Sequence, residues 1–225
     1  EPRTGGKRDQ RPLTADGDEV TTHAPFCPTM PEQVKLVGAT PVIVPTRADE
    51  GFVVHAEAVV AAITPRTKAI IINSPCNPTG GLVDEAMLTP IVEAAAKRGI
   101  WIVVDLCYEQ LIYENVAHNL PKVLFDRHRD RTVIAGSASK SYAMTGWRCG
   151  WTIAPKELTG AFNTIQGQTT SNIASITQMA ALAAISGPQD EVTFMLNEYR
   201  RRRDQIHGWV TAQPAIQCVE AKGGF

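Results

Sequence analysis

The chain has 225 residues, of which 44% are hydrophobic and 20% are charged, and its formal net charge is -1. This composition is that of an ordinary globular protein that can bury one large core, and the balanced charge argues against nucleic acid or an anionic membrane as a partner. No apolar stretch approaches the length that crosses a bilayer, and the polar residues 1–12 lack the apolar core of a secretion signal. We therefore expect no membrane partner and a cytoplasmic location.

The five cysteines lie at positions 27, 76, 107, 149 and 218, and no two of them form a C-x-x-C pair. An odd number of cysteines without metal-ligand spacing is typical of reduced thiols in a cytosol-like compartment. The sequence thus predicts no metal site.

Strands and helices are predicted to alternate along the chain. The strands are expected, in chain order, at 19–22, 41–44, 69–72, 100–104, 132–135 and 150–154. The third, fourth and fifth of these segments are continuous apolar runs, which are typical of strands buried on both faces of a parallel sheet.

Two helices stand out between and after these strands. Apolar residues recur at helical spacing over 84–98, and Gly99 follows where a helix often ends. A longer amphipathic helix is predicted over 190–210; its four arginines at 200–203 spread around the helix, which favours a solvated surface with ion pairs over a nucleic-acid site. Strands alternating with helices of this length predict an α/β fold, a mostly parallel sheet sandwiched by helices.

Polar residues follow three of the predicted strands at the point where each strand ends. Because the carboxyl ends of parallel strands meet at one edge of a sheet, ligands bind there and we expect these side chains to converge. The residues concerned are Asn77, Asp105, Tyr108, Ser137, Ser139, Lys140 and Arg148.

The chemistry of these residues fits a single small ligand. A carboxylate at the end of an apolar strand, such as Asp105, needs a cation or hydrogen-bond donors, and burial can make an amine such as Lys140 nucleophilic. Arg148 and the two serines suit a phosphate, and Tyr108 and Asn77 can donate to a phenolate oxygen.

Three strings in this region resemble the signature of class I/II aminotransferases, the pyridoxal-phosphate (PLP) enzymes of fold type I, in both order and spacing. The longest is the most specific, and Gly5-Gly6-Lys7 resembles the phosphate loop of the same family. The resemblance extends from about Thr4 to Gly208. The strings are Asn77-Pro78-Thr79-Gly80, Asp105-x-x-Tyr108 and Ser137-x-Ser139-Lys140-x-x-x-Met144-x-Gly146-Trp147-Arg148-x-Gly150.

The resemblance implies a role for each of these residues. Lys140 would form the internal aldimine with pyridoxal 5'-phosphate and shuttle a proton, and Asp105 would pair with the protonated ring nitrogen. Tyr108 and Asn77 would donate hydrogen bonds to the ring 3-oxygen. The expected catalytic residues are thus Lys140, Asp105 and Tyr108. The phosphate would be held by Gly6, Lys7, Ser137, Ser139 and Arg148.

The same resemblance implies the reaction and the partners. An amino group would pass from an amino acid to a 2-oxo acid by a ping-pong route, in a homodimer. A second interpretation keeps the cofactor and changes the reaction to a β-lyase elimination. A third is a non-catalytic PLP-binding module or a degenerate fragment.

Two departures from the family pattern stand out. Cys27 occupies the position where the family usually has an aromatic residue stacked on the cofactor ring. The family's N-terminal arm and most of its small domain have no counterpart in the sequence. We therefore expect residues 1–205 to form an incomplete PLP-binding large domain and residues 206–225 to begin a truncated C-terminal small domain.

Overall fold

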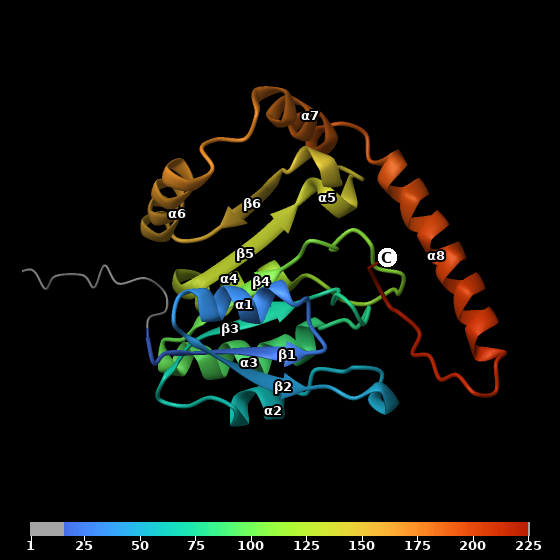
Figure 1. Cartoon of the computed structure of the whole chain (residues 1–225), viewed down its shortest axis with the longest axis horizontal. Coiled ribbons are helices and arrows are strands. Elements are labelled where there is room, and N and C mark those ends of the chain that lie inside the picture. Colours follow the sequence, from blue (N-terminus) through green and yellow to red (C-terminus); the bar gives the residue numbers. More distant parts are fainter. Residues whose placement is uncertain (1–15, 225) are drawn as a thin grey trace, which may run out of the picture.

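The computed structural model describes residues 16–224, which form a six-stranded sheet in the order β2-β1-β3-β4-β5-β6 (Figure 1). Strands β1 to β5 are parallel, and β6 runs antiparallel to β5. The mostly parallel sheet predicted from the sequence is therefore present. The strands are β1 Glu19–Ala24, β2 Thr40–Pro45, β3 Thr67–Asn73, β4 Trp101–Asp105, β5 Thr132–Ser137 and β6 Gly150–Ile153.

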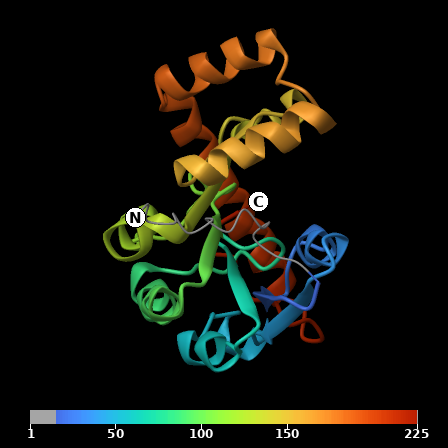
Figure 2. The same ribbon diagram turned by 90° about the vertical axis from the view of Figure 1, so that its left-hand side faces the viewer.

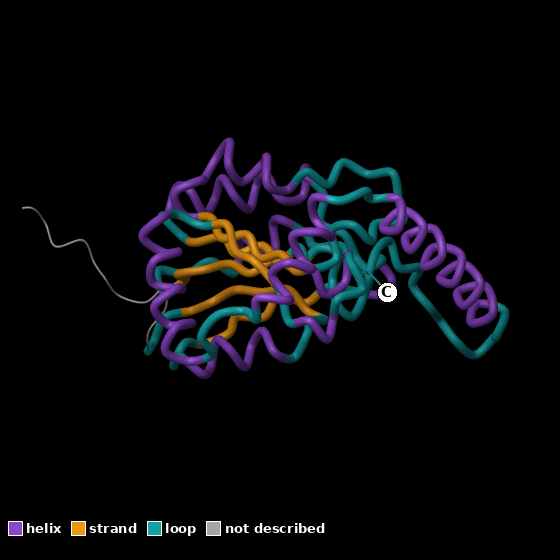
Figure 3. Tube along the Cα trace, turned by 90° about the horizontal axis from the view of Figure 1, so that it is seen from above, coloured by secondary structure: helices purple, strands orange, loops and turns teal. Residues whose placement is uncertain are grey.

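Helices cover both faces of this sheet, so that the strands lie between helical layers (Figure 3). Helices α2, α3 and α4 lie on one face and α1 on the other (Figure 2). The α-helices are α1 Thr29–Leu36, α2 Ala56–Ala61, α3 Glu85–Arg98, α4 Leu120–His128, α5 Ala138–Ser141, α6 Lys156–Thr169, α7 Ser175–Ser186 and α8 Asp190–Thr211. Short 3-10 helices occur at η1 Ala48–Glu50, η2 Arg129–Arg131 and η3 Thr145–Trp147.

Helix α3 shows how the local sequence sets these elements. The Asp84 side chain accepts a hydrogen bond of 2.8 Å from the backbone N–H of Met87 and caps the first turn, and Gly99 ends the helix with a left-handed φ of 65°. Leu88 and Ile91 on its inner face are fully buried against the sheet. The helix predicted over 84–98 is thus confirmed.

The main core lies between the sheet and the face covered by α2, α3 and α4. Apolar residues of β3 and β4 are buried there together with the inner faces of these helices, among them Ile70, Ile72, Ile102, Val104, Leu120 and Leu124. A smaller cluster packs Val34 of α1 against Val20 and Ala69 on the other face. Burial on both faces explains why β3 and β4 are continuous apolar runs.

Helix α8 lies apart from the sheet, beyond the carboxyl ends of the parallel strands (Figure 1). The predicted solvated surface with ion pairs is present at Arg201 and Arg202, which both bind the Glu198 carboxylate, at 2.7 and 2.8 Å, whereas the Arg203 side chain is only 13% exposed. The helix is continuous over 190–211, so a boundary between residues 205 and 206 falls inside it, and the proposed domain division stays a prediction. Among residues 16–224, no helix has both the length and the apolar character needed to span a bilayer.

The Thr21 side chain on β1 is fully buried, and its hydroxyl has no hydrogen-bond partner among the described residues. We expect Thr21→Val to raise the free energy of unfolding by about 1 kcal/mol, because valine has the same shape without the unsatisfied hydroxyl. Urea denaturation measures this change. The matched control is Thr67→Val, which should destabilise the fold, because the Thr67 hydroxyl accepts a hydrogen bond of 2.9 Å from the backbone N–H of Thr64. A loss of stability in Thr21→Val would contradict the expectation.

Candidate active site

Three neighbouring strands bring the predicted site residues to one edge of the sheet. In the register of the parallel strands, Asp105 at the end of β4 lies opposite Asn73 of β3 on one side and Ala135 of β5 on the other. The loop after β3 carries Asn77, and the short helix after β5 carries Lys140. The polar segments therefore leave adjacent strands in the same direction.

Asp105 is half-buried, and its carboxylate accepts a hydrogen bond of 2.9 Å from the backbone N–H of Cys107. Burial raises the pKa of Asp105, and the hydrogen bond from Cys107 opposes this effect. Its carboxylate forms no ion pair with any residue in the described part of the chain. A partly desolvated carboxylate in this setting fits a ligand that brings a cationic N–H group, such as a protonated pyridine nitrogen.

Tyr108 and Asn77 form the second part of the site. The Asn77 side-chain amide lies 3.4 Å from the Tyr108 hydroxyl, within hydrogen-bond distance. Burial raises the pKa of Tyr108 to about 12, and the neighbouring Cys107, Asp105 and Cys27 add to this shift. The phenol therefore keeps its O–H proton at physiological pH, so the pair fits an anionic oxygen on an aromatic ring.

Lys140 lies within α5, directly after β5. The Ser137 hydroxyl caps this helix by accepting a hydrogen bond of 3.0 Å from the backbone N–H of Ser139. The Lys140 ammonium lies 5.8 Å from the centroid of the Tyr108 ring, a cation–π arrangement that directs the amine toward the phenol. The structure thus brings Lys140, Tyr108 and Asn77 together.

Asp105 at the end of β4 and Lys140 after the paired strand β5 both influence the pKa of the Cys107 thiol. Burial raises the pKa of Cys107, and the Asp105 carboxylate raises it further, whereas the Ser137 hydroxyl and the Lys140 ammonium lower it. Both charged groups therefore act on a single side chain. Asp105 ends β4 and Lys140 follows β5, the strand paired with β4, so the two residues do not lie at opposite edges of the sheet.

The predicted phosphate side is less fully assembled. The Ser137 hydroxyl donates to the Cys149 carbonyl at 3.2 Å, and Ser139 is buried. Arg148 is exposed and donates to the carbonyl of Thr145 in its own loop, at 2.9 Å. Gly6 and Lys7 lie outside the described residues. The contacts of these side chains with an anion stay predictions.

Two residues that the sequence analysis did not single out belong to this site. Asn73 holds the Asn77 loop, because its side-chain oxygen accepts a hydrogen bond of 2.8 Å from the Asn77 backbone N–H. The pKa of Cys107 is raised by the charge of Asp105 and lowered by the charge of Lys140. Their positions in the sequence could have indicated them. Asn73 ends an apolar strand, as Asp105 does, and Cys107 lies between Asp105 and Tyr108. Cys27 makes a small contribution to the raised pKa of Tyr108, and its place beside the cofactor ring stays a prediction.

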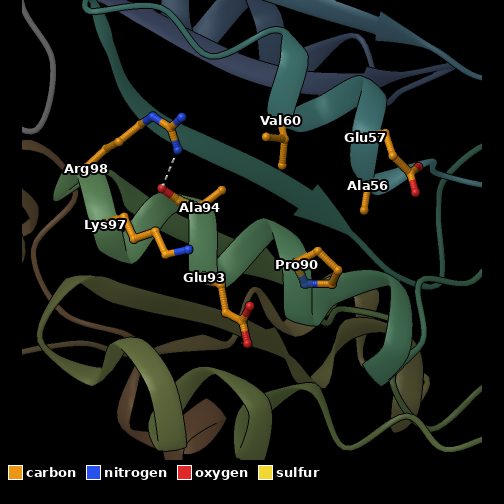
Figure 4. Close-up of a pocket in the computed structure, with 8 residues that line it drawn as sticks. All are labelled: Ala56, Glu57, Val60, Pro90, Glu93, Ala94, Lys97 and Arg98. Atoms are coloured by element: carbon orange, nitrogen blue, oxygen red, sulfur yellow. Dashed lines mark hydrogen bonds between the residues drawn. The ribbon is translucent and has the colours of Figure 1, made fainter.

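A separate surface hollow of about 410 Å³ lies between α2 and α3 (Figure 4). It contains none of the predicted site residues. Side chains of both charge signs line it, together with small apolar side chains. The Arg98 guanidinium donates to the Ala94 carbonyl at 3.1 Å. Its charged residues of α3 lie close to the start of β4, whereas Asp105 lies at the end of that strand. We assign it no function.

An amine, a carboxylate and a phenol at the carboxyl edge of a parallel sheet place this chain among the α/β proteins that bind a ligand at that edge. The family model "Aminotransferase class I and II" matches residues 11–225. The chain belongs to this family.

Individual relatives agree with the family match. The chain is 40% identical over 210 residues to the aspartate/prephenate aminotransferase of Cereibacter sphaeroides, which covers 93% of this chain and 52% of that protein. It is also 40% identical over 213 residues to the aspartate aminotransferase of Geobacillus stearothermophilus, with coverage of 95% and 54%. The chain thus spans about half the length of the curated relatives it matches.

The fold is also found in a solved structure. The aspartate aminotransferase from Rhizobium meliloti superposes with a TM-score of 0.89 at 35% sequence identity, covering 94% of this chain and 53% of that chain. This match confirms the predicted fold, that of the large domain of fold type I enzymes.

Because burial raises the pKa of Tyr108 to about 12, this phenol should ionise later than a free tyrosine. We expect the difference in tyrosinate absorbance between the wild type and Tyr108→Phe to develop near pH 12 rather than near pH 10. In the unfolded chain Tyr108 ionises at a lower pH than in the folded protein. The protonated phenol therefore contributes fully to the free energy of unfolding below about pH 10, and this contribution is lost as the pH rises toward 12. A difference titration centred at pH 10 in the folded protein would contradict this.

Proposed function

We propose that this chain forms the pyridoxal 5'-phosphate site of an aminotransferase that acts on amino-acid and 2-oxo-acid substrates. The observation that carries the proposal is the shared neighbourhood of Lys140, Tyr108 and Asp105, in which the carboxylate has no ion-pair partner among the described residues. Family membership supports the same cofactor and the same reaction. Two relatives named for aspartate support aspartate as the amino donor.

Pyridoxal phosphate, when bound, supplies an aldehyde that reacts with amines and an electron-poor ring that withdraws charge from the amino-acid Cα. The residues of this chain would hold and orient it. Asp105 keeps a proton on the ring nitrogen, and Tyr108 with Asn77 donates to the ring oxygen. Lys140 holds the cofactor through its amine and moves a proton at the substrate Cα. On the phosphate side we propose Ser137, Ser139 and Arg148, together with Gly6 and Lys7.

We also propose that the protein works as a homodimer in the cytoplasm. The dimer is supported by four large apolar side chains that are exposed on the single helix α7: Ile176, Met179, Leu182 and Ile185. The location is supported by the five cysteines, all of which are free.

The covalent step is tested by borohydride reduction in the presence of pyridoxal 5'-phosphate, followed by peptide mapping. We expect a pyridoxyl adduct on Lys140 and none at this position in Lys140→Ala. The matched control is Lys122→Ala, which removes an exposed lysine paired with Asp126 and should leave the Lys140 adduct intact. An adduct spread over surface lysines, with no preference for Lys140, would refute the assignment.

The reaction is tested with L-aspartate and a 2-oxo acid, by following the conversion of bound cofactor to its pyridoxamine form. Lys140→Ala should slow this conversion at least about a thousandfold, because the proton-transferring amine is gone. A Lys140 adduct without conversion would support cofactor binding and contradict amino-group transfer. Release of pyruvate, ammonia and a thiol from an amino acid that carries a thiol leaving group on Cβ, without conversion of the cofactor, would favour a β-lyase.

The proposed dimer is tested by light scattering on the purified protein. We expect twice the mass of one chain, because several large apolar side chains exposed on one helix are unfavourable in water unless they are covered. Leu182→Glu should shift the protein toward the monomer, whereas Gln178→Glu on the same helix should not. A monomeric wild type at micromolar concentration would contradict the dimer.

A further inference from the structure

His23 near the end of β1 makes a hydrogen bond that the sheet itself does not provide. The backbone pairing between β1 and β3 ends at Thr22 opposite Ile71, two residues before Asn73. In a parallel ladder, every second residue of a strand directs its N–H group to the same neighbour, so the next N–H group on this edge belongs to Asn73. The His23 ring nitrogen Nε2 accepts from it at 3.2 Å. The imidazole thus replaces the missing backbone acceptor.

The His23 ring is a suitable acceptor because it is neutral. Its side chain is buried, with 4% of the residue exposed. Burial lowers the pKa of His23 to about 4, against a smaller opposing effect of the Asn73 backbone. Because Nε2 accepts a hydrogen bond, the ring proton lies on Nδ1. The acceptor is therefore present throughout the physiological pH range.

The Asn73 side chain forms hydrogen bonds with two parts of the candidate site, the Asn77 loop and the end of β4. Its side-chain oxygen accepts from the Asn77 backbone N–H at 2.8 Å, and its side-chain amide donates to the Asp105 backbone carbonyl at 3.3 Å. Asn77 in turn reaches the Tyr108 hydroxyl. One buried asparagine thus links the residue proposed to bond the ring oxygen with the residue proposed to pair with the ring nitrogen.

We propose that His23 is a positioning residue of this site: by fixing the backbone of Asn73, it sets the place of the Asn77 amide and of the Asp105 backbone. His23 touches neither the ligand nor the reacting atoms and acts through Asn73. What the site binds rests on the function proposed above, whereas the placement of Asn73 and Asn77 does not.

The placement is tested without cofactor, by amide hydrogen exchange of Asn73 and Asn77 normalised to exchange in α3. His23→Leu removes the acceptor and should speed exchange at both positions about tenfold. His23→Gln and His23→Asn retain an acceptor, and at least one of them should restore exchange to within about twofold of the wild type. The control is Thr21→Val on the same strand, whose hydroxyl has no partner among the described residues and which should leave both amides unchanged.

The consequence for the site is tested by titrating pyridoxal 5'-phosphate and recording its absorbance. His23→Leu should weaken cofactor binding about tenfold, as expected when one supporting hydrogen bond is lost, and the acceptor-retaining variant that restores exchange should restore binding. Unchanged exchange in His23→Leu, or exchange that neither polar variant restores, would overturn the proposal. If the wild type binds no pyridoxal 5'-phosphate, the proposed function fails, and the exchange measurement alone still decides the role of His23.

Discussion

The parallel register of β3, β4 and β5 is the constraint on which the site depends. It places Asp105 directly between Asn73 and Ala135, so the segments that follow these strands begin side by side. The register is in turn maintained by apolar side chains buried on the strands, such as Ile72 and Val104, because a slip by one residue would turn them away from the core. Burial of the core thus also determines the position of the chemical groups.

The loop that carries Asn77 is held from several directions. The Ser74 hydroxyl lies 2.8 Å from Nε2 of His118, and the Ser74 backbone N–H donates to the Asp105 carbonyl at 3.1 Å. At its far end, the Gly80 carbonyl accepts from the backbone N–H groups of Lys222 and Gly223, at 2.9 and 3.1 Å. Gly80 has a left-handed φ of 69°, and a side chain there would collide with Ala221. Such a loop can hold a donor in place without a ligand.

Three of the arginines of α8, Arg201 to Arg203, differ in their surroundings although their sequence does not distinguish them. Arg201 and Arg202 pair with Glu198 on the helix surface, as the pattern predicts. Arg203 is only 13% exposed at its side chain, lies 5.0 Å from the Tyr113 ring and donates to the Ala221 carbonyl at 2.6 Å. It therefore joins α8, the segment after β4 and the segment that reaches Gly80.

The sequence by itself determined the strands, the limits of α3 and the expectation that Asn77, Asp105 and Lys140 meet, because periodicity, helix caps and strand direction act over a few neighbouring residues. Only the tertiary structure decided that β6 runs antiparallel, that Arg148 binds its own loop and that His23 supports Asn73, fifty residues away. Contacts of this kind depend on which strands pair and where each pairing ends. Those features are set by the packing of the whole core, and no local pattern encodes them.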